Sequence, residues 1–210
     1  MSRSASRVLA APVQWQPSFL GFEFDTGTLV ARASQVERLP LIHGAWVDQS
    51  NEAVAAPDAL FEQVLKTAPW SSHERPMYDR MVVEPRLTTR CWAEPPTSLV
   101  DLADVLSDRY AIDLRAISAN FYRDGADSVA WHGDRIRHRG GETVVAILSL
   151  GGARRFLLRP RDGGASIRLL PGSGDLLVMG GTCQRTWEHS VPKCAIAPPR
   201  ISIMFREPGA

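Results

Sequence analysis

Residues 143–181, TVVAILSLGGARRFLLRPRDGGASIRLLPGSGDLLVMGG, decide the fold class that this sequence predicts. Short runs rich in Val, Ile and Leu alternate with connections that contain paired glycines or Pro-Gly, which is the pattern of short strands joined by turns. The pattern begins near residue 115 and predicts strands over 117–122, 143–150, 155–159, 167–170, 175–179 and 200–206. Strands of this length and spacing predict a β-sandwich or a double-sheet jelly roll.

The chain before residue 115 has a different character and predicts two helices. The first covers 57–68, where apolar residues recur on one face. The second runs from about Ser98, which resembles a capping box with Asp101, and its apolar face consists of Val100, Ala103, Leu106 and Tyr110. We expect loops and a hairpin over 70–96, and the fold class is therefore α+β.

Length and composition narrow the classes of protein to which the chain can belong. A chain of 210 residues with 44% hydrophobic and 22% charged residues fits one globular domain rather than a disordered chain. No apolar run approaches the roughly 20 residues of a membrane helix, so we expect no membrane association. Three cysteines form an odd and sparse set, which argues against a disulfide framework and favours a cytoplasmic location.

The net charge of +1 conceals an asymmetry along the chain. Residues 1–110 carry 10 basic and 14 acidic side chains, a balance of −4, whereas residues 111–210 carry 14 basic and 9 acidic ones, a balance of +5. Almost all of the basic residues are Arg, which suits contacts to carboxylate and phosphate better than Lys does. An Arg-rich proteome is the alternative explanation for this excess.

His132-Gly133-Asp134 is the sharpest chemical signal in the sequence. Residues two apart on a strand, or at its end, point to the same side. With His189 they make two histidines and one carboxylate, the facial triad of non-haem Fe(II) oxygenases, which leaves positions open for a co-substrate and O₂. A His-x-Asp motif is weak evidence on its own, because such a pair is often only a hydrogen-bonded loop.

The strand expected at 200–206 strengthens this interpretation. Its alternation places four side chains on one face: Arg200, Ser202, Met204 and Arg206. Two arginines inside a barrel are costly unless an anion neutralises them, and a dicarboxylate suits the guanidinium group. Asn120 and Tyr122 can supply neutral hydrogen bonds to the same ligand. Alternatively, Asn120 is a turn residue at a strand end, and Tyr122 is an aromatic residue of the core.

Several motifs together resemble the AlkB family of Fe(II)/2-oxoglutarate dioxygenases, which demethylate alkylated nucleobases. The resemblance covers about residues 65–206 and rests on these segments: Met77-Tyr78, Pro85-Arg86-Leu87-Thr88, Asn120-Phe121-Tyr122, His132-Gly133-Asp134, Ser149-Leu150-Gly151, 174–179, Trp187-Glu188-His189 and Pro199-Arg200…Arg206. It implies a double-stranded β-helix, the jelly-roll barrel of the family, with an N-terminal extension that forms a substrate lid. We expect residues 1–55, which the resemblance does not cover, to be an irregular extension of short strands and loops packed on the core. The resemblance places helices and the nucleotide-recognition lid at 56–115 and the catalytic core at 116–210.

The resemblance also implies roles for individual residues. His132, Asp134 and His189 would bind Fe(II) as the catalytic centre. Arg200 would pair with the distal carboxylate of 2-oxoglutarate, and the other residues expected to hold this co-substrate are Asn120, Tyr122, Ser202 and Arg206. O₂ would be the second co-substrate.

Two departures from the family pattern affect these expectations. The closing motif of the family is usually R-x-N-x-T-x-R, whereas this chain has Ser202 and Met204 at the Asn and Thr positions. Many relatives carry acidic residues after the metal-binding Asp, but this chain continues with Arg135-Ile136-Arg137-His138. The second departure leaves the preferred base open and makes a phosphate contact more plausible.

The resemblance implies an oxidative demethylase of N-alkylated bases in DNA or RNA, active in repair of alkylation damage and releasing formaldehyde, succinate and CO₂. The target must be single-stranded or flipped out, because a base inside a duplex cannot reach such a pocket. The expected substrate contacts are Arg75, Tyr78, Arg86, Trp92, Arg135 and Arg137. Arginines on a solvated surface, and Trp92 in simple packing, are the alternatives.

We expect the protein to act as a monomer. Two other functions stay open at this point. One is a 2-oxoglutarate oxygenase that hydroxylates a protein side chain or a small molecule. The other is a catalytically silent jelly-roll protein that holds a structural metal.

Overall fold

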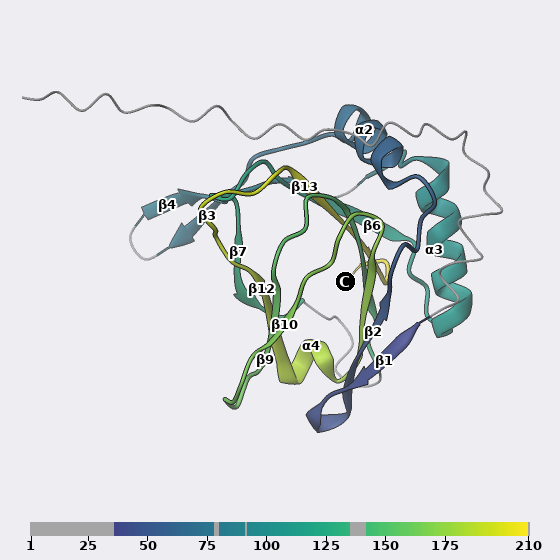
Figure 1. The fold of residues 1–210 in the computed structure, drawn as a ribbon, viewed down its shortest axis with the longest axis vertical. Helices are drawn as coiled ribbons and strands as arrows, with labels where there is room; N and C mark the ends of the chain where they lie inside the picture. Colours follow the sequence, from purple (N-terminus) through teal and green to yellow (C-terminus); the bar gives the residue numbers. More distant parts are fainter. Residues whose placement is uncertain (1–35, 78–79, 91, 135–141, 210) are drawn as a thin grey trace, which may run out of the picture.

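The computed structural model describes residues 36–77, 80–90, 92–134 and 142–209. Two antiparallel sheets face each other to form an open barrel, and two helices cover the outer side of the larger sheet (Figure 1). A short two-stranded hairpin, β3 (Glu74–Met77) with β4 (Arg80–Val83), extends from the barrel. This arrangement is the fold that the strand pattern predicted for the β-rich part of the chain.

The larger sheet has seven strands in the order β1-β2-β11-β8-β13-β6-β5. Their bounds are β1 (Glu37–Pro40), β2 (Ala45–Ser50), β5 (Leu87–Thr89), β6 (Ala116–Tyr122), β8 (Val145–Gly151), β11 (Leu176–Gly181) and β13 (Arg200–Arg206). The smaller sheet has the order β10-β9-β12-β7, with bounds β7 (Val129–His132), β9 (Phe156–Pro160), β10 (Ile167–Leu169) and β12 (Trp187–Val191). The one-turn helices η1 (Ile42–Gly44) and α4 (Cys183–Thr186) lie in connections.

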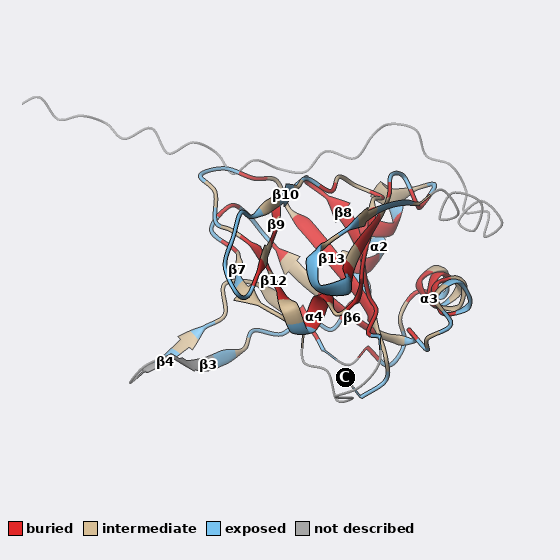
Figure 2. Cartoon of the chain, turned by 90° about the horizontal axis from the view of Figure 1, so that it is seen from below, coloured by how far each residue is buried: buried red, intermediate tan, exposed pale blue. Residues whose placement is uncertain are grey.

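The apolar core has two layers, one on each face of the larger sheet. The residues of β8 alternate between these layers: Ala146, Leu148 and Leu150 pack on the helix side, whereas Val145 and Ile147 face the barrel interior. A strand that is buried on both faces has a continuous apolar sequence, which explains the apolar run at 144–148. Figure 2 shows this buried layer across the middle of the barrel.

Both predicted helices are present and pack on the larger sheet. Helix α2 (Pro57–Thr67) has Pro at its N-terminus and buries Leu60, Phe61 and Val64. Helix α3 (Thr97–Tyr110) begins after Pro96 without a side-chain cap, so the capping box expected at Ser98 and Asp101 is wrong. Its buried face also differs from the expected one, because Val100 is exposed while Leu99 and Leu102 are buried.

The larger sheet begins far upstream of the boundary expected at residue 116. Strand β2 pairs with β11 along its whole length, and β1 pairs with β2 at the edge of the sheet. Residues 37–50 contain the short strands expected of the extension, but these strands belong to the barrel itself. Residues 1–35 of that expected extension lie outside the described residues. Of the helices that the structure describes, none has the length and apolar composition needed to span a bilayer.

Candidate metal and co-substrate site

The two predicted histidine ligands meet across a pair of strands. His132 ends β7, and His189 lies directly opposite it in β12. Their ring centroids are 4.2 Å apart, and Asp134 follows His132 by two residues. One potential ligand atom from each of the three residues lies within 4.8 Å of the others. The structure therefore brings the predicted triad together.

The protein orients both imidazole rings for binding through nitrogen. Nδ1 of His132 lies 2.8 Å from the Ala130 carbonyl oxygen, which can only accept a hydrogen bond, so Nδ1 donates and Nε2 stays available. The ring of Phe156 stacks on His189, with centroids 5.3 Å apart. Burial lowers the pKa of His189 to about 4, so this imidazole is neutral at physiological pH. The neutral form is the one that binds a metal.

Asp134 shows how a cation would complete the site. Its backbone N–H donates to Oε1 of Gln184 at 2.9 Å, and its Oδ1 lies 3.2 Å from Nη2 of Arg206. Its Oδ2 is buried and has no hydrogen-bond partner among the described residues. A buried carboxylate oxygen without a partner is costly. A divalent cation held with the two imidazoles satisfies this oxygen, so the donor set fits Fe(II).

Gly133, between two of the triad residues, has no room for a side chain. A Cβ atom at this position would lie 2.7 Å from the backbone oxygen of Gln184 and would also meet the Arg161 guanidinium group. The close approach of α4 to residue 133 explains why glycine stands in the middle of the motif. It also brings Gln184 within reach of Asp134, a contact that no local sequence pattern indicated.

Strand β13 carries the second half of the site. Its inward face includes Ser202, Met204 and Arg206, while Ile201, Ile203 and Phe205 pack in the helix-side core. This confirms the alternation expected from the sequence. Each inward residue pairs with a residue of β6: Ser202 with Asn120, and Met204 with Ser118.

Arg200 is a buried cation without a described carboxylate partner. It donates through Nη1 to the Ser202 hydroxyl and through Nη2 to the Ser149 hydroxyl, the latter at 2.9 Å. Its guanidinium carbon lies 5.5 Å from the centroid of the Tyr122 ring. Burial lowers the pKa of Arg200 to about 10, and its Nε has no hydrogen-bond partner among the described residues. A buried guanidinium group in this state favours an anionic ligand.

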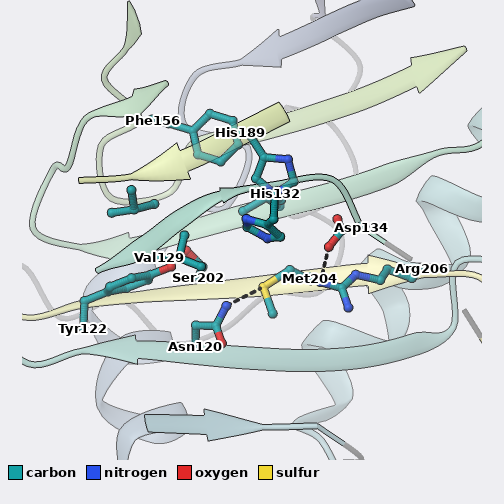
Figure 3. Close-up of a pocket in the computed structure, with 12 residues that line it drawn as sticks. Asn120, Tyr122, Val129, His132, Asp134, Phe156, His189, Ser202, Met204 and Arg206 are labelled. Carbon is teal, nitrogen blue, oxygen red and sulfur yellow. Dashed lines mark hydrogen bonds and ion pairs between the residues drawn. The ribbon is translucent and has the colours of Figure 1, made fainter. Parts of the chain in front are cut away.

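A cavity connects the triad with four of the five expected co-substrate residues, and Arg200 lies outside its lining (Figure 3). His132, Asp134 and His189 lie along one part of its wall, and the residues of the larger sheet line the rest: Asn120, Tyr122, Ser202, Met204 and Arg206. Arg86 donates from Nε to Oδ1 of Asn120 at 3.2 Å. Since Arg only donates, the amide oxygen of Asn120 must face Arg86. Its Nδ2 donor then points toward the sulfur of Met204, at 3.7 Å inside the cavity.

A second and larger cavity, with a volume of about 550 Å³, lies against the first. The two cavities share Asn120, Val129, His132, Asp134, Met204 and Arg206. The larger cavity extends across β6 to β5, where Thr88, Arg86 and Arg90 line it. A group that enters here reaches the triad without crossing the core.

The expected substrate contacts have different outcomes. Arg86 lines the larger cavity, but its side chain is largely enclosed and lies 3.1 Å from the Glu84 carboxylate. Trp92 is buried in the helix-side core with Leu99 and Leu102, so its interpretation as a stacking surface for a base is wrong. Arg75 lies in β3, and its side chain is not described; Tyr78, Arg135 and Arg137 lie outside the described residues.

Comparison with known proteins defines the class to which this fold and site belong. Residues 47–206 match the family model described as the 2OG-Fe(II) oxygenase superfamily. The chain belongs to this superfamily, whose name states the metal and the co-substrate that the site fits.

Among curated proteins, the chain is similar to AlkB homologues, which confirms the resemblance found in its motifs. It is 30% identical over 173 residues to "Alpha-ketoglutarate-dependent dioxygenase alkB homolog 3" of Bos taurus, covering 71% of this chain and 60% of the relative. It is 29% identical over 190 residues to "DNA oxidative demethylase ALKBH2" of Arabidopsis thaliana, covering 70% and 60%. The chain thus spans about 60% of the length of these relatives.

Solved structures share the fold at low sequence identity. A structure of OsALKBH1 superposes with a TM-score of 0.54 at 16% identity, covering 81% of this chain and 100% of that one. A prolyl hydroxylase from Trichoplax adhaerens superposes with a TM-score of 0.56 at 12% identity, covering 87% and 89%. These likenesses concern the fold alone.

Proposed function

We propose that this protein is an Fe(II)- and 2-oxoglutarate-dependent dioxygenase that removes N-alkyl groups from bases of DNA or RNA in repair of alkylation damage, releasing formaldehyde, succinate and CO₂. The observation that supports the proposal is the contact between the two cavities: His132 and Asp134 line both of them, and His189 lines the smaller one. The names of the similar curated proteins, alkB homolog 3 and DNA oxidative demethylase, support it.

The residues divide the work of holding the reactants. His132, His189 and Asp134 would hold the metal, and the buried Oδ2 of Asp134 would gain a partner. Arg200 would neutralise the distal carboxylate of 2-oxoglutarate together with the Ser202 hydroxyl. Tyr122 and the Nδ2 of Asn120 would donate to the same co-substrate, with Arg206 at its other end. When bound, the metal and 2-oxoglutarate supply the activation of O₂.

The protein itself supplies orientation and shielding from water. The hydrogen bond of His132 to the Ala130 carbonyl and the stacking of Phe156 on His189 fix the two rings. Apolar side chains, Val129, Ile147 and Val191, line the cavity near the triad and limit the access of water. A substrate held in the larger cavity would present its alkyl group at this wall.

The β3–β4 hairpin is the candidate for the expected lid over the substrate base. The β3–β4 hairpin extends from the barrel on the side of β7, and β5 follows it in the chain (Figures 1 and 2). We propose that this region closes over a base that is single-stranded or flipped out of a duplex, since a stacked base cannot reach the cavity. We also propose that the protein acts as a monomer in the cytoplasm.

One incubation separates the proposed function from its alternatives. The purified protein is supplied with Fe(II), 2-oxoglutarate and oligonucleotides that carry N-methylated bases, in single-stranded and duplex DNA and in RNA. Formaldehyde release with restored bases supports demethylation. Succinate formation without base repair points instead to oxidation of a protein side chain or small molecule. The absence of any 2-oxoglutarate turnover contradicts the proposal and leaves a structural metal-binding protein.

A further inference from the structure

Three hydroxyl groups in the lining of the larger cavity, those of Thr88, Thr89 and Ser118, have no hydrogen-bond partner among the described residues, and two of them share the face of the co-substrate residues. Thr88 of β5 pairs with Asn120 of β6, and Ser118 of β6 pairs with Met204 of β13. Because paired residues of neighbouring strands share a face, both hydroxyl-bearing side chains lie on the inward face with the co-substrate residues. Both residues line the larger cavity.

These hydroxyl groups are buried and have no described partner. Thr88 is 4% exposed and Ser118 is 9% exposed, yet neither Oγ1 of Thr88 nor Oγ of Ser118 forms a hydrogen bond in the described part of the chain. Leaving a buried hydroxyl without a partner is unfavourable for folding. At the wall of an open cavity, a ligand can supply the partner that the protein does not. A hydroxyl rotates freely about its C–O bond and can donate to a carbonyl oxygen.

The cations that line the cavity outnumber the carboxylates that line it, and Arg86 and Arg90 also face the Glu84 carboxylate. The described lining of the cavity includes the cations Arg86, Arg90 and Arg206, and its one described carboxylate is Asp134. Asp134 already faces Arg206 and belongs to the metal triad. The sequence that follows it, residues 135–141, contains no Asp or Glu. No described carboxylate of this wall is therefore free to neutralise a positively charged base.

Building on the function proposed above, we propose that this cavity selects N-alkylated bases that are uncharged at neutral pH and present a carbonyl oxygen, over N-alkylated bases that carry a positive charge. The Thr88 and Ser118 hydroxyls donate to that carbonyl oxygen. A hydroxyl can also accept from an amino group, but only a base with a carbonyl oxygen at this wall pairs its O–H donor, and a buried donor left unpaired costs affinity. The two hydroxyls are thus specificity-determining residues at the boundary between β5, β6 and the triad.

The test compares four single-stranded oligonucleotides of the same sequence. Two carry a neutral base with a carbonyl edge, 1-methylguanine or 3-methylthymine, and two carry a cationic base, 1-methyladenine or 3-methylcytosine. We expect kcat/KM, measured from formaldehyde release, to be about tenfold or more higher for the two neutral bases than for the two cationic bases. Fluorescence anisotropy with the metal-free protein reports the same preference as a difference in Kd, independently of turnover.

Variants connect the preference to the two hydroxyls. Thr88→Val and Ser118→Ala should each lower kcat/KM for the neutral bases by about five- to tenfold and lower it much less for 1-methyladenine, which has no carbonyl oxygen. Thr88→Ser keeps a hydroxyl and should retain most of the preference, which separates loss of the hydrogen bond from a folding defect. Thr67→Val is the matched control, because this threonine donates to the Gln63 carbonyl oxygen on the surface of α2.

The outcomes distinguish the two proposals. Turnover of cationic bases at rates equal to or above those of neutral bases, with no effect of Thr88→Val and Ser118→Ala on the ratio, overturns the inference and leaves the demethylase function intact. Absence of formaldehyde from all four oligonucleotides, with correctly folded and metal-loaded protein, contradicts the proposed function itself. In that case the anisotropy preference still decides whether the cavity selects neutral bases.

Discussion

His132 and Asp134 illustrate what a residue pattern can reveal about a site. Their spacing of two on a strand end is a local property, so the pair is visible in the sequence. His189 became a candidate only through the combination of residue types, since it is 57 positions away. Gln184, which fixes the backbone of Asp134, could not be predicted, because its contact depends on the path of α4 between two strands.

Replacement of His132 tests the triad at the scale of one residue. We expect His132→Ala to weaken Fe(II) affinity by about a hundredfold or more, since three ligands become two. Isothermal titration with Fe(II) under anaerobic conditions measures this directly. His73→Ala is the control, because His73 lies outside both cavities and contacts Ser71. Unchanged affinity in His132→Ala would refute the assignment of the triad.

Arg200 provides a second residue-scale prediction. Arg200→Ala should raise the KM for 2-oxoglutarate by about ten- to a hundredfold and change kcat much less. The reason is that a charged hydrogen bond to the distal carboxylate contributes roughly 1.5–3 kcal/mol. Steady-state kinetics with varied 2-oxoglutarate checks this split. The KM of Arg200→Lys for 2-oxoglutarate should lie between that of the wild-type protein and that of Arg200→Ala. An equal loss in kcat at saturating 2-oxoglutarate would count against a binding role.

Among the secondary-structure elements, the sequence pattern predicted strands that are buried on both faces. It missed short strands that carry polar site residues. The apolar runs of β8, β11 and β13 are evident because these strands are buried on both faces. β7 and β12 were not predicted. Both are short, and both carry polar site residues that interrupt the apolar pattern. The pairing of β2 with the barrel could not be predicted, because its partner, β11, lies more than a hundred residues away in the chain.

The attachment of β2 to the barrel depends on Trp46 and a glycine in the next strand. Gly180 pairs with Trp46, and a Cβ atom at Gly180 would overlap the indole ring. We expect Gly180→Ala to lower the free energy of unfolding by about 1–3 kcal/mol, because the ring must move from its packed position. Urea denaturation measures the change. Gly172→Ala is the control, since its nearest neighbour would be at ordinary contact distance, and equal stability of both variants would contradict this account.

Helix α3 is connected to the same edge through Tyr110. Tyr110 stacks on Trp46, and its hydroxyl donates to the Asp48 carboxylate at 3.0 Å. Burial of the phenol, and to a smaller extent the negative charge of Asp48, raises the pKa of Tyr110 to about 12. The folded state therefore favours the protonated phenol. Its contribution to stability is present below the ordinary pKa of about 10 and is lost as the pH rises toward 12.

The Tyr110→Phe variant tests this coupling. Stability measured by urea denaturation should fall more steeply for the wild-type protein than for the variant between pH 10 and pH 12. Far-ultraviolet circular dichroism verifies that both proteins start folded. Parallel declines of the two proteins over this interval would show that the phenol of Tyr110 contributes nothing.

In the whole molecule, part of the basic excess of the second half of the sequence lies in the interior of the barrel. Arg200 and Arg206 lie inside the barrel, where the co-substrate is proposed to bind, and Arg86 and Arg90 line the larger cavity. The basic excess is therefore partly committed to internal contacts rather than spread over one face. Part of the rest stabilises the fold, as when Arg154 donates to three backbone carbonyl groups.

This distribution predicts a modest salt dependence of nucleic-acid binding. For a single-stranded oligonucleotide, the slope of log affinity against log salt concentration should be about −2 to −3, as expected for three or four phosphate contacts. Fluorescence anisotropy over a series of salt concentrations gives this slope. A slope steeper than about −6 would instead indicate a broad basic surface.

We propose that the triad, of which His132 and Asp134 line both cavities, removes alkyl groups from nucleic-acid bases. Mass spectrometry of a single-stranded oligonucleotide with one N-methylated base tests this most directly, after incubation with Fe(II), 2-oxoglutarate and O₂. We predict loss of the methyl group with wild-type protein, and an unchanged oligonucleotide when 2-oxoglutarate is omitted or His132→Ala is used. Retention of the methyl group by 1-methylguanine, 3-methylthymine, 1-methyladenine and 3-methylcytosine alike, with metal-loaded wild-type protein, would contradict the account.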